Sequence, residues 1–118
     1  MQRSEIWLVN LDPTVGAEIS KTRPALIVSD DNVGKLPLRI VAPITDWKDR
    51  YTIAPWMIRI DATAENGLSK SSAIDTFQLR SIATERFIRK LGNIADEKVN
   101  EVERGLILVL RLPIKMLK

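Results

Sequence analysis

The chain alternates short apolar stretches with polar segments that contain glycine, proline, asparagine or aspartate. Such alternation is typical of a protein built mostly from β-strands. β-Branched and aromatic residues are frequent in the apolar stretches, and turn-forming residues separate them. The pattern predicts strands at residues 6–11, 24–29, 38–44, 57–60, 72–82 and 87–91. A single helical turn is expected at residues 84–86, just before the last strand.

The first predicted strand is apolar on both faces. Because successive side chains of a strand point to opposite sides, Trp7, Val9 and Leu11 share one face. Ile6 and Leu8 occupy the other face. A strand of this kind is expected to be buried on both faces. We therefore expect one face of the strand to lie in the core and the other to lie against a partner subunit.

One helix is predicted near the C-terminus. Asp96 is a favourable N-cap, and Glu97 places negative charge in the first turn. Apolar residues then recur at helical spacing, at Val99, Val102, Leu106, Val109 and Leu110. Gly105 is unfavourable inside a helix and indicates a close approach to another backbone, and Pro113 ends the helix. Residues 1–118 therefore form one mainly β domain, a curved sheet or barrel followed by a helix.

Composition narrows the possible chemistry. The sequence of 118 residues contains no cysteine and no histidine, which excludes disulfides, thiolate metal sites and imidazole catalysis. Any catalysis must use carboxylates, hydroxyls, lysine, arginine or Tyr51. The net charge of +3 is compatible with a polyanionic partner. No apolar run approaches the roughly 18 residues of a membrane span, and the N-terminus lacks a signal-peptide pattern, so we expect a cytoplasmic protein.

Two polar loops are candidates for function. The first separates the first two strands with about ten residues, whereas a hairpin that only turns needs two to five. It carries the carboxylate of Glu18 and the amine of Lys21, and it leads directly to Arg23. The second loop, at residues 45–51, places Trp47 among charged residues. Long polar loops on a rigid sheet commonly present chemistry.

A family resemblance rests on several runs of residues. These are I-W-L-V-N-L-D-P-T-V-G-A-E at residues 6–18, K-T-R-P-A-L-I-V-S at 21–29, I-V-A-P-I-T-D-W at 40–47 and A-I-D-T-F-Q-L-R-S-I at 73–82. With these runs the chain closely resembles the MazF/PemK family of toxin endoribonucleases, over nearly its whole length. The resemblance implies the SH3-like barrel with a C-terminal helix of the MazF, PemK and CcdB toxins, working as a homodimer.

The resemblance also implies an activity. Members of this family are mRNA interferases that cleave single-stranded RNA at short sequence motifs without a metal or other cofactor, inhibiting translation and growth. Each is held inactive by a cognate antitoxin, whose extended tail lies over the RNA groove. The family's catalytic arginine and threonine match Arg23 and Thr45, and its first-loop acid matches Glu18. Neither the RNA motif nor the identity of the antitoxin follows from the sequence.

Metal-free cleavage constrains what these residues do. The ribose 2′-hydroxyl attacks the adjacent phosphate, which requires a proton acceptor, a proton donor and cationic hydrogen-bond donors on the phosphate. The planar guanidinium of Arg23 suits the cationic role, and the hydroxyl of Thr45 adds a hydrogen bond. A guanidinium loses its proton only above about pH 12, which favours Arg23 as the donor. Glu18 is then either the base or a group that orients Arg23.

Sequence-specific cleavage also requires bases that stack on aromatic side chains or are read at their edges. The residues expected to bind RNA are Asn10, Thr14, Lys21, Trp47, Lys48, Arg50, Asp75 and Gln78. Two other readings compete with the nuclease. One is a non-enzymatic gyrase-binding toxin on the same barrel, and the other is an RNA-binding module without catalysis. The presence of Glu18, Arg23 and Thr45 together argues against both. Without the family resemblance, however, a surface Arg23 paired with Glu18 is the favoured reading.

Overall fold

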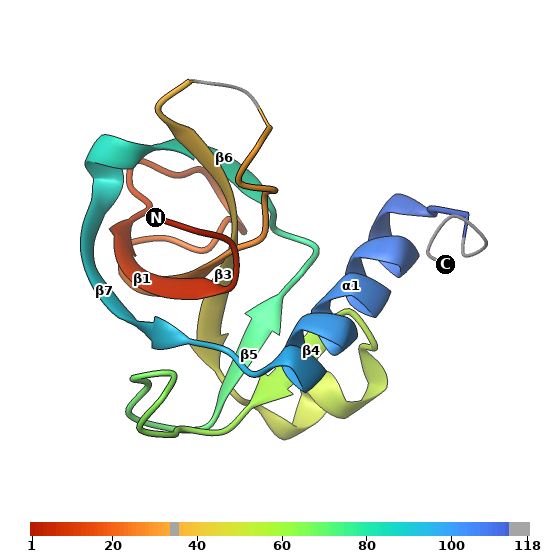
Figure 1. Ribbon diagram of the computed structural model, residues 1–118. Coiled ribbons are helices and arrows are strands. Elements are labelled where there is room, and N and C mark those ends of the chain that lie inside the picture. Colours follow the sequence, from red (N-terminus) through yellow and green to blue (C-terminus); the bar gives the residue numbers. More distant parts are fainter. Residues whose placement is uncertain (34–35, 114–118) are drawn as a thin grey trace.

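The computed structural model describes residues 1–33 and 36–113. In this part of the chain seven strands precede one α-helix (Figure 1). The strands are β1 (Glu5–Asn10), β2 (Thr22–Ile27), β3 (Leu38–Asp46), β4 (Met57–Ile60), β5 (Ser72–Asp75), β6 (Arg80–Ala83) and β7 (Phe87–Asn93). Two 3-10 helices, η1 (Asp49–Ile53) and η2 (Thr84–Arg86), interrupt the connections, and the α-helix is α1 (Asp96–Leu110). The prediction of a mainly β fold with a C-terminal helix is confirmed.

The long strand β3 joins the two ends of the sheet. All strand pairs are antiparallel, in the order β4-β5-β3-β2-β1-β7, and β6 also pairs with β3. Residues 38–41 of β3 pair with β6, and residues 44–46 pair with β5. Pro43 lies between these two pairings, where an interrupted ladder tolerates a residue without an N–H. Figure 1 shows β3 passing through the middle of the molecule, with β1 and β7 on one side and β5, β4 and α1 on the other.

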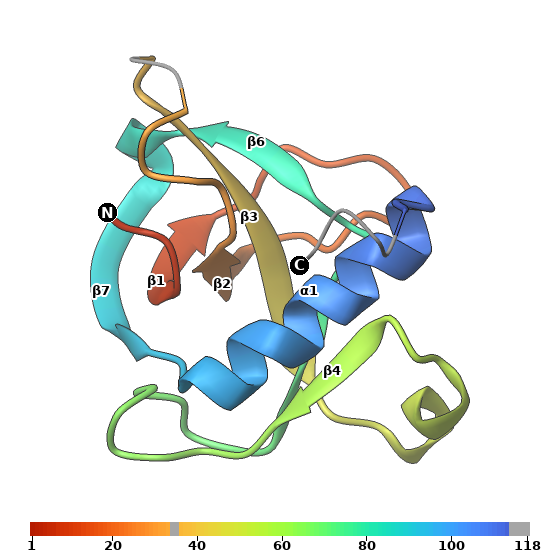
Figure 2. The same ribbon diagram turned by 45° about the vertical axis from the view of Figure 1, so that its right-hand side comes forward.

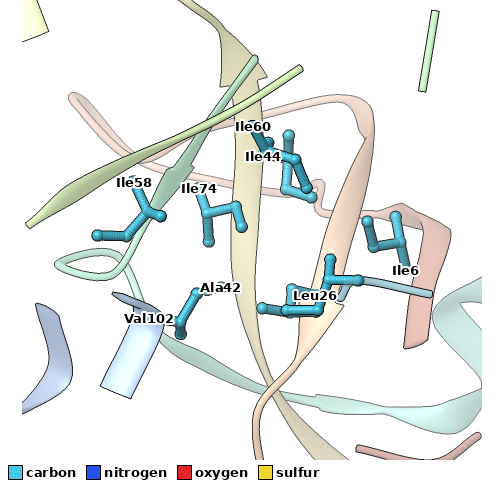
Figure 3. Close-up of a cluster of buried hydrophobic side chains, with 9 residues drawn as sticks. Ile6, Leu26, Ala42, Ile44, Ile58, Ile60, Ile74 and Val102 are labelled. Atoms are coloured by element: carbon cyan, nitrogen blue, oxygen red, sulfur yellow. The ribbon is translucent and has the colours of Figure 1, made fainter. Parts of the chain in front are cut away.

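Two clusters of buried side chains stabilise the sheet. The first lies between the sheet and the helix (Figure 3) and comprises Ile6, Leu26, Ala42, Ile44, Ile58, Ile60, Ile74, Ile94 and Val102. The second comprises Val9, Leu11, Ala25, Ile27, Val41, Ile82 and Phe87. Strand β1 contributes to both clusters, because the curved sheet covers both of its faces. Trp7 on one face and Leu8 on the other remain only partly buried, so the expectation that one face of β1 meets a partner subunit stays a prediction.

The strand predicted at residues 72–82 is divided in the structure into β5 and β6. The carboxylate of Asp75 accepts a hydrogen bond from the N–H of Phe77 at 3.0 Å, which stabilises a turn. Thr76 is fully buried, and its hydroxyl donates to the carbonyl of Trp56 at 2.7 Å. These contacts redirect the chain, so a pattern that suggested one long strand forms two short ones.

Helix α1 begins where expected but is capped differently. Asp96 is its first helical residue, and Ala95 occupies the N-cap position without a side-chain hydrogen bond, so the N-cap prediction for Asp96 is wrong. At the other end Arg111 adopts a left-handed conformation, with φ of 55°, and Pro113 follows. Figure 2 shows α1 lying across the molecule beside β4. Within residues 1–33 and 36–113, no helix has the length and apolar character needed to cross a membrane.

Gly105 allows α1 to pack closely on the turn after β5. A Cβ at this position would lie 2.9 Å from the hydroxyl oxygen of Thr76, closer than real Cβ atoms approach another atom. The close neighbour is thus a buried side chain and not the backbone that the sequence suggested. This contact fixes the helix against the turn that connects β5 to β6.

Candidate active site

Arg23 and Thr45 lie together although they are distant in the sequence. The antiparallel pairing of β2 and β3 ends with Ala25 opposite Pro43, and Arg23 and Thr45 each lie two residues beyond this last pair, at the same end of the two strands. Both side chains line one cavity of about 330 Å³. Arg23 is near the start of β2 and Thr45 near the end of β3, so regular backbone holds both residues.

Local sequence fixes the backbone and the side chain of Arg23. The following residue is Pro24, and a residue before proline is restricted to extended conformations. The Nε atom of Arg23 donates a hydrogen bond to the carbonyl of Ser20 at 3.2 Å. No hydrogen bond joins its two terminal nitrogens to another group in the described part of the chain. These nitrogens are therefore available to an anion in the cavity, in the planar arrangement that suits two phosphate oxygens.

Two further cations line the same cavity. Lys70 reaches it from the loop between β4 and β5, and its Nζ lies 3.1 Å from a carboxylate oxygen of Asp46. Arg89 reaches it from β7, where it pairs with Leu8 of β1. Three positive side chains and one carboxylate therefore line the cavity, and this excess of positive charge favours binding of an anion. Sequence reasoning missed Lys70 and Arg89, because the sheet order that brings β7 and the loop to Arg23 is not readable from local pattern.

Glu18 lies outside this cavity. Its carboxylate accepts a hydrogen bond from the N–H of Val15 at 2.7 Å, within the first loop, which we define as residues 11–21. It lines a separate hollow of about 350 Å³ with Phe77, Gln78 and neighbouring residues. No ion pair joins Glu18 to Arg23 among residues 1–33 and 36–113. The structure thus brings Arg23 to Thr45, but it does not bring Glu18 to either of them.

Gln78 and Asp75 are both used within the chain. The carboxamide of Gln78 accepts from the N–H of Ile19 at 2.7 Å and donates to the carbonyl of Ala17 at 3.3 Å. Asp75 is buried, and burial raises the pKa of its carboxyl despite hydrogen bonds from the N–H groups of Phe77 and Gln78. Base reading by Gln78 and Asp75 stays a prediction, one that these engaged or buried positions do not support.

Three other residues predicted to bind RNA lie on β1 or the first loop. Asn10 is exposed, and its side-chain oxygen accepts the N–H of Asp12 at 3.0 Å. Thr14 donates to the carboxylate of Asp12 at 3.4 Å, and Lys21 is exposed with φ of 69°. None of the three lines the cavity of Arg23 and Thr45. Their predicted contacts with RNA therefore lie beside the cavity and not within it.

The second loop forms an aromatic and cationic cluster. Trp47 is half-buried and meets the ring of Tyr51 edge to face, with 5.7 Å between the ring centroids. The guanidinium of Arg59 lies 5.1 Å from the centre of a Trp47 ring, and that of Arg50 lies 5.4 Å from the Tyr51 ring. Lys48 is exposed beside them. Trp47, Lys48 and Arg50 are thus brought together as predicted, while Arg59, which already covers Trp47, was missed.

Comparison with known proteins defines the class of this chain. The family model described as PemK-like, MazF-like toxin of type II toxin-antitoxin system matches residues 2–110. The chain belongs to this family. It is 34% identical over 118 residues to the endoribonuclease MazF9 of Mycobacterium tuberculosis, covering 95% of this chain and 98% of that protein.

Solved structures agree on the fold. MazF from Deinococcus radiodurans superimposes with a TM-score of 0.77 at 23% identity, covering 94% of this chain and 96% of that one. An endoribonuclease from a mycobacterial species, solved in complex with its cognate antitoxin, has a TM-score of 0.74 at 15% identity, with 96% and 97% covered. The resemblance to the MazF/PemK family and its barrel fold is confirmed. The gyrase-binding alternative is not favoured, because the relative at 34% identity is an endoribonuclease.

Proposed function

We propose that this toxin is an endoribonuclease that cleaves single-stranded RNA, with the scissile phosphate held between Arg23 and Thr45. The observation that carries the proposal is their shared cavity of about 330 Å³. Lys70 and Arg89 in its wall supply the positive charge that a polyanionic substrate requires. The relation to an endoribonuclease of Mycobacterium tuberculosis, at 34% identity, supports the same reaction.

The reaction proceeds at a single phosphodiester. The ribose 2′-oxygen attacks phosphorus and forms a new P–O bond, and the bond from phosphorus to the 5′-oxygen breaks. The products are a 2′,3′-cyclic phosphate and a free 5′-hydroxyl. Negative charge grows on the two non-bridging oxygens, where the terminal nitrogens of Arg23 and the hydroxyl of Thr45 donate hydrogen bonds. Fixed donors aimed at developing charge are commonly the largest contribution to catalysis.

Proton transfer follows from the same positions. Arg23 donates a proton to the departing 5′-oxygen, and the proton of the 2′-hydroxyl passes to solvent, from which the guanidinium is protonated again. The carboxylate of Glu18 accepts a hydrogen bond from the N–H of Val15 and lines a different hollow, so it does not contact the phosphate. The positive charge of Arg23, Lys70 and Arg89 takes the place that a metal ion holds in other nucleases, and the reaction therefore proceeds without one.

We also propose that the toxin is a cytoplasmic homodimer controlled by a cognate antitoxin. The net charge of +3 and the cationic cavity favour an acidic segment that folds on binding. The mycobacterial endoribonuclease solved with its cognate antitoxin supports this mode of control. Light scattering during gel filtration measures the oligomeric state directly, and a monomer at micromolar concentration contradicts the dimer.

The experiment uses a long defined transcript without stable structure. The purified chain is incubated with it in excess EDTA, and sequencing of the new 5′ ends gives both activity and motif. Arg23→Ala is expected to reduce cleavage by a factor of about 10² to 10³ or more, and Thr45→Val to reduce it less. Arg104→Ala, an exposed arginine of α1 outside the cavity, is the matched control. Undiminished cleavage by Arg23→Ala, with the melting temperature unchanged in all variants, refutes the proposal.

A further inference from the structure

Gln78 connects the turn between β5 and β6 to the first loop. Its carboxamide oxygen accepts from the N–H of Ile19 at 2.7 Å, and its nitrogen donates to the carbonyl of Ala17 at 3.3 Å. One planar group therefore holds both sides of a short backbone segment. Figure 2 shows the first loop, in orange, running beside β6.

The segment that Gln78 holds is adjacent to the group that holds Arg23. Ile19 is followed by Ser20, whose carbonyl accepts the hydrogen bond from Nε of Arg23 at 3.2 Å. A continuous set of contacts thus leads from Gln78 through two residues of backbone to the guanidinium. Displacement of the Ile19 backbone moves the Ser20 carbonyl. The guanidinium of Arg23 then loses the hydrogen bond that fixes its orientation.

Other side chains hold different parts of the first loop. Arg80 donates to the carbonyl of Leu11 at 2.6 Å, and Arg86 donates to the carbonyl of Asp12. The N–H of Lys21 donates to the carboxylate of Asp12 at 3.0 Å, which closes the neck of the loop. In the described structure, Gln78 is the side chain from outside the loop that hydrogen-bonds to the backbone of residues 17–19.

The support behind Gln78 is more rigid than the loop it contacts. Thr76, two residues earlier, is fully buried and bonded to Trp56, and Gly105 of α1 packs directly against it. In the loop, by contrast, Val15 is 80% exposed. A turn anchored by the buried Thr76 thus holds residues 17–19 of an exposed loop through the side chain of Gln78.

We propose that Gln78 is a positioning residue for Arg23. It fixes Ile19 and Ser20 so that the Ser20 carbonyl holds the guanidinium with both terminal nitrogens directed to the phosphate. This inference rests on the proposed endoribonuclease function. It gives Gln78 a role distinct from reading a base edge, because both hydrogen-bonding ends of the carboxamide are used by the loop.

The test compares variants on one oligonucleotide that the unmodified toxin cuts. Gln78→Met is nearly isosteric and removes both hydrogen bonds, whereas Gln78→Glu keeps an acceptor for the N–H of Ile19. Gln78→Met is expected to lower kcat about fivefold to tenfold, the factor that one hydrogen bond of ordinary strength represents, with KM changed less than about twofold. Gln78→Glu is expected to retain more activity. Gln2→Met, at the other glutamine of the chain, is the matched control and is expected to match the unmodified toxin.

A second measurement separates positioning from general weakening of the fold. In an Arg23→Lys background the hydrogen bond from Nε to Ser20 is gone, so Gln78→Met is expected to cause no further loss of kcat. Amide hydrogen exchange without RNA is expected to be faster at Ile19 in Gln78→Met and unchanged in the control. This exchange result does not depend on cleavage, so a toxin that cuts no RNA refutes the proposed function and leaves the contact itself still testable.

Three outcomes overturn the inference. Equal kcat in Gln78→Met and the unmodified toxin removes any role for the contact. Equal loss of kcat in both Arg23 backgrounds shows that Gln78 does not act through Arg23. A changed cleavage motif with unchanged exchange at Ile19 shows that Gln78 reads a base instead.

Discussion

Replacing Gly105 by alanine tests the packing of α1 against the turn after β5. In an exposed helix, alanine is more favourable than glycine by about 1 kcal/mol, so helix propensity alone predicts a more stable protein. In this structure the new Cβ would lie 2.9 Å from the hydroxyl oxygen and 3.1 Å from the methyl group of Thr76. Helix propensity and packing therefore predict changes of opposite sign in the free energy of unfolding for the same substitution.

The contact distances allow the two effects to be compared. Placing an extra carbon in a well-packed site costs about 1 to 3 kcal/mol. Thr76 is fully buried and cannot rotate away without losing its hydrogen bond to the carbonyl of Trp56, which contributes about 1 kcal/mol. Because the lost hydrogen bond adds to the packing cost, subtracting the gain in propensity leaves an expected decrease of about 1 to 3 kcal/mol in the free energy of unfolding of Gly105→Ala. The melting temperature of a domain of this size then falls by roughly 4 to 12 °C.

Urea denaturation of four proteins measures this directly. They are the unmodified toxin, Gly105→Ala, Thr76→Ala and the double variant. Thr76→Ala removes the two nearest atoms, leaving only a Cβ at 3.4 Å, an ordinary contact. In that background Gly105→Ala is expected to stabilise the protein by up to about 1 kcal/mol, because only the propensity gain remains. A destabilisation of equal size in both backgrounds contradicts the reasoning.

Three other substitutions test separate parts of the structure. Arg89→Gln is expected to weaken RNA binding and to reduce the slope of log affinity against log salt by about 0.7, the value for one phosphate contact on a single strand, as a salt titration measures. Burial alone would raise the pKa of the Glu5 carboxyl, but the hydrogen bond from Trp7, a backbone N–H of Gln2 and the charges of the N-terminal amine and Lys90 lower it. Glu5 therefore stabilises the fold above the ordinary glutamate pKa and loses this contribution as pH falls through its lowered value. Glu5→Gln is expected to cost about 1 kcal/mol at pH 7 and progressively less as the pH falls below the ordinary glutamate pKa, as urea denaturation over a series of pH values measures; a cost that does not change with pH refutes the charge argument. Glu18→Ala is expected to reduce kcat less than about threefold, whereas a loss of a hundredfold would identify Glu18 as the general base.

Local pattern was sufficient where one segment alone determines its structure. The strand at residues 57–60 and the helical turn at residues 84–86 occur where the sequence placed them. The local sequence pattern gave the wrong boundaries where a contact between distant residues determines where a strand ends. The division between β5 and β6 depends on the bond from Thr76 to Trp56, and neither residue shows in its own segment that the other is near.

Only some residues of the candidate site could be predicted from the sequence. Arg23 and Thr45 were identified by family resemblance, and the antiparallel register now gives the physical reason why they meet. Lys70 and Arg89 were missed because their place at the cavity depends on the order of strands in the sheet. Gln78 was identified as a polar side chain of interest, but the sequence could not show that its partner is the first loop.

The register between β2 and β3 also limits where residues can be inserted or deleted in such toxins during evolution. Side chains alternate across a strand, so one residue inserted shortly before Thr45 would turn its hydroxyl to the opposite surface of the sheet. We therefore expect insertions or deletions of an odd number of codons within these two strands to be eliminated by selection.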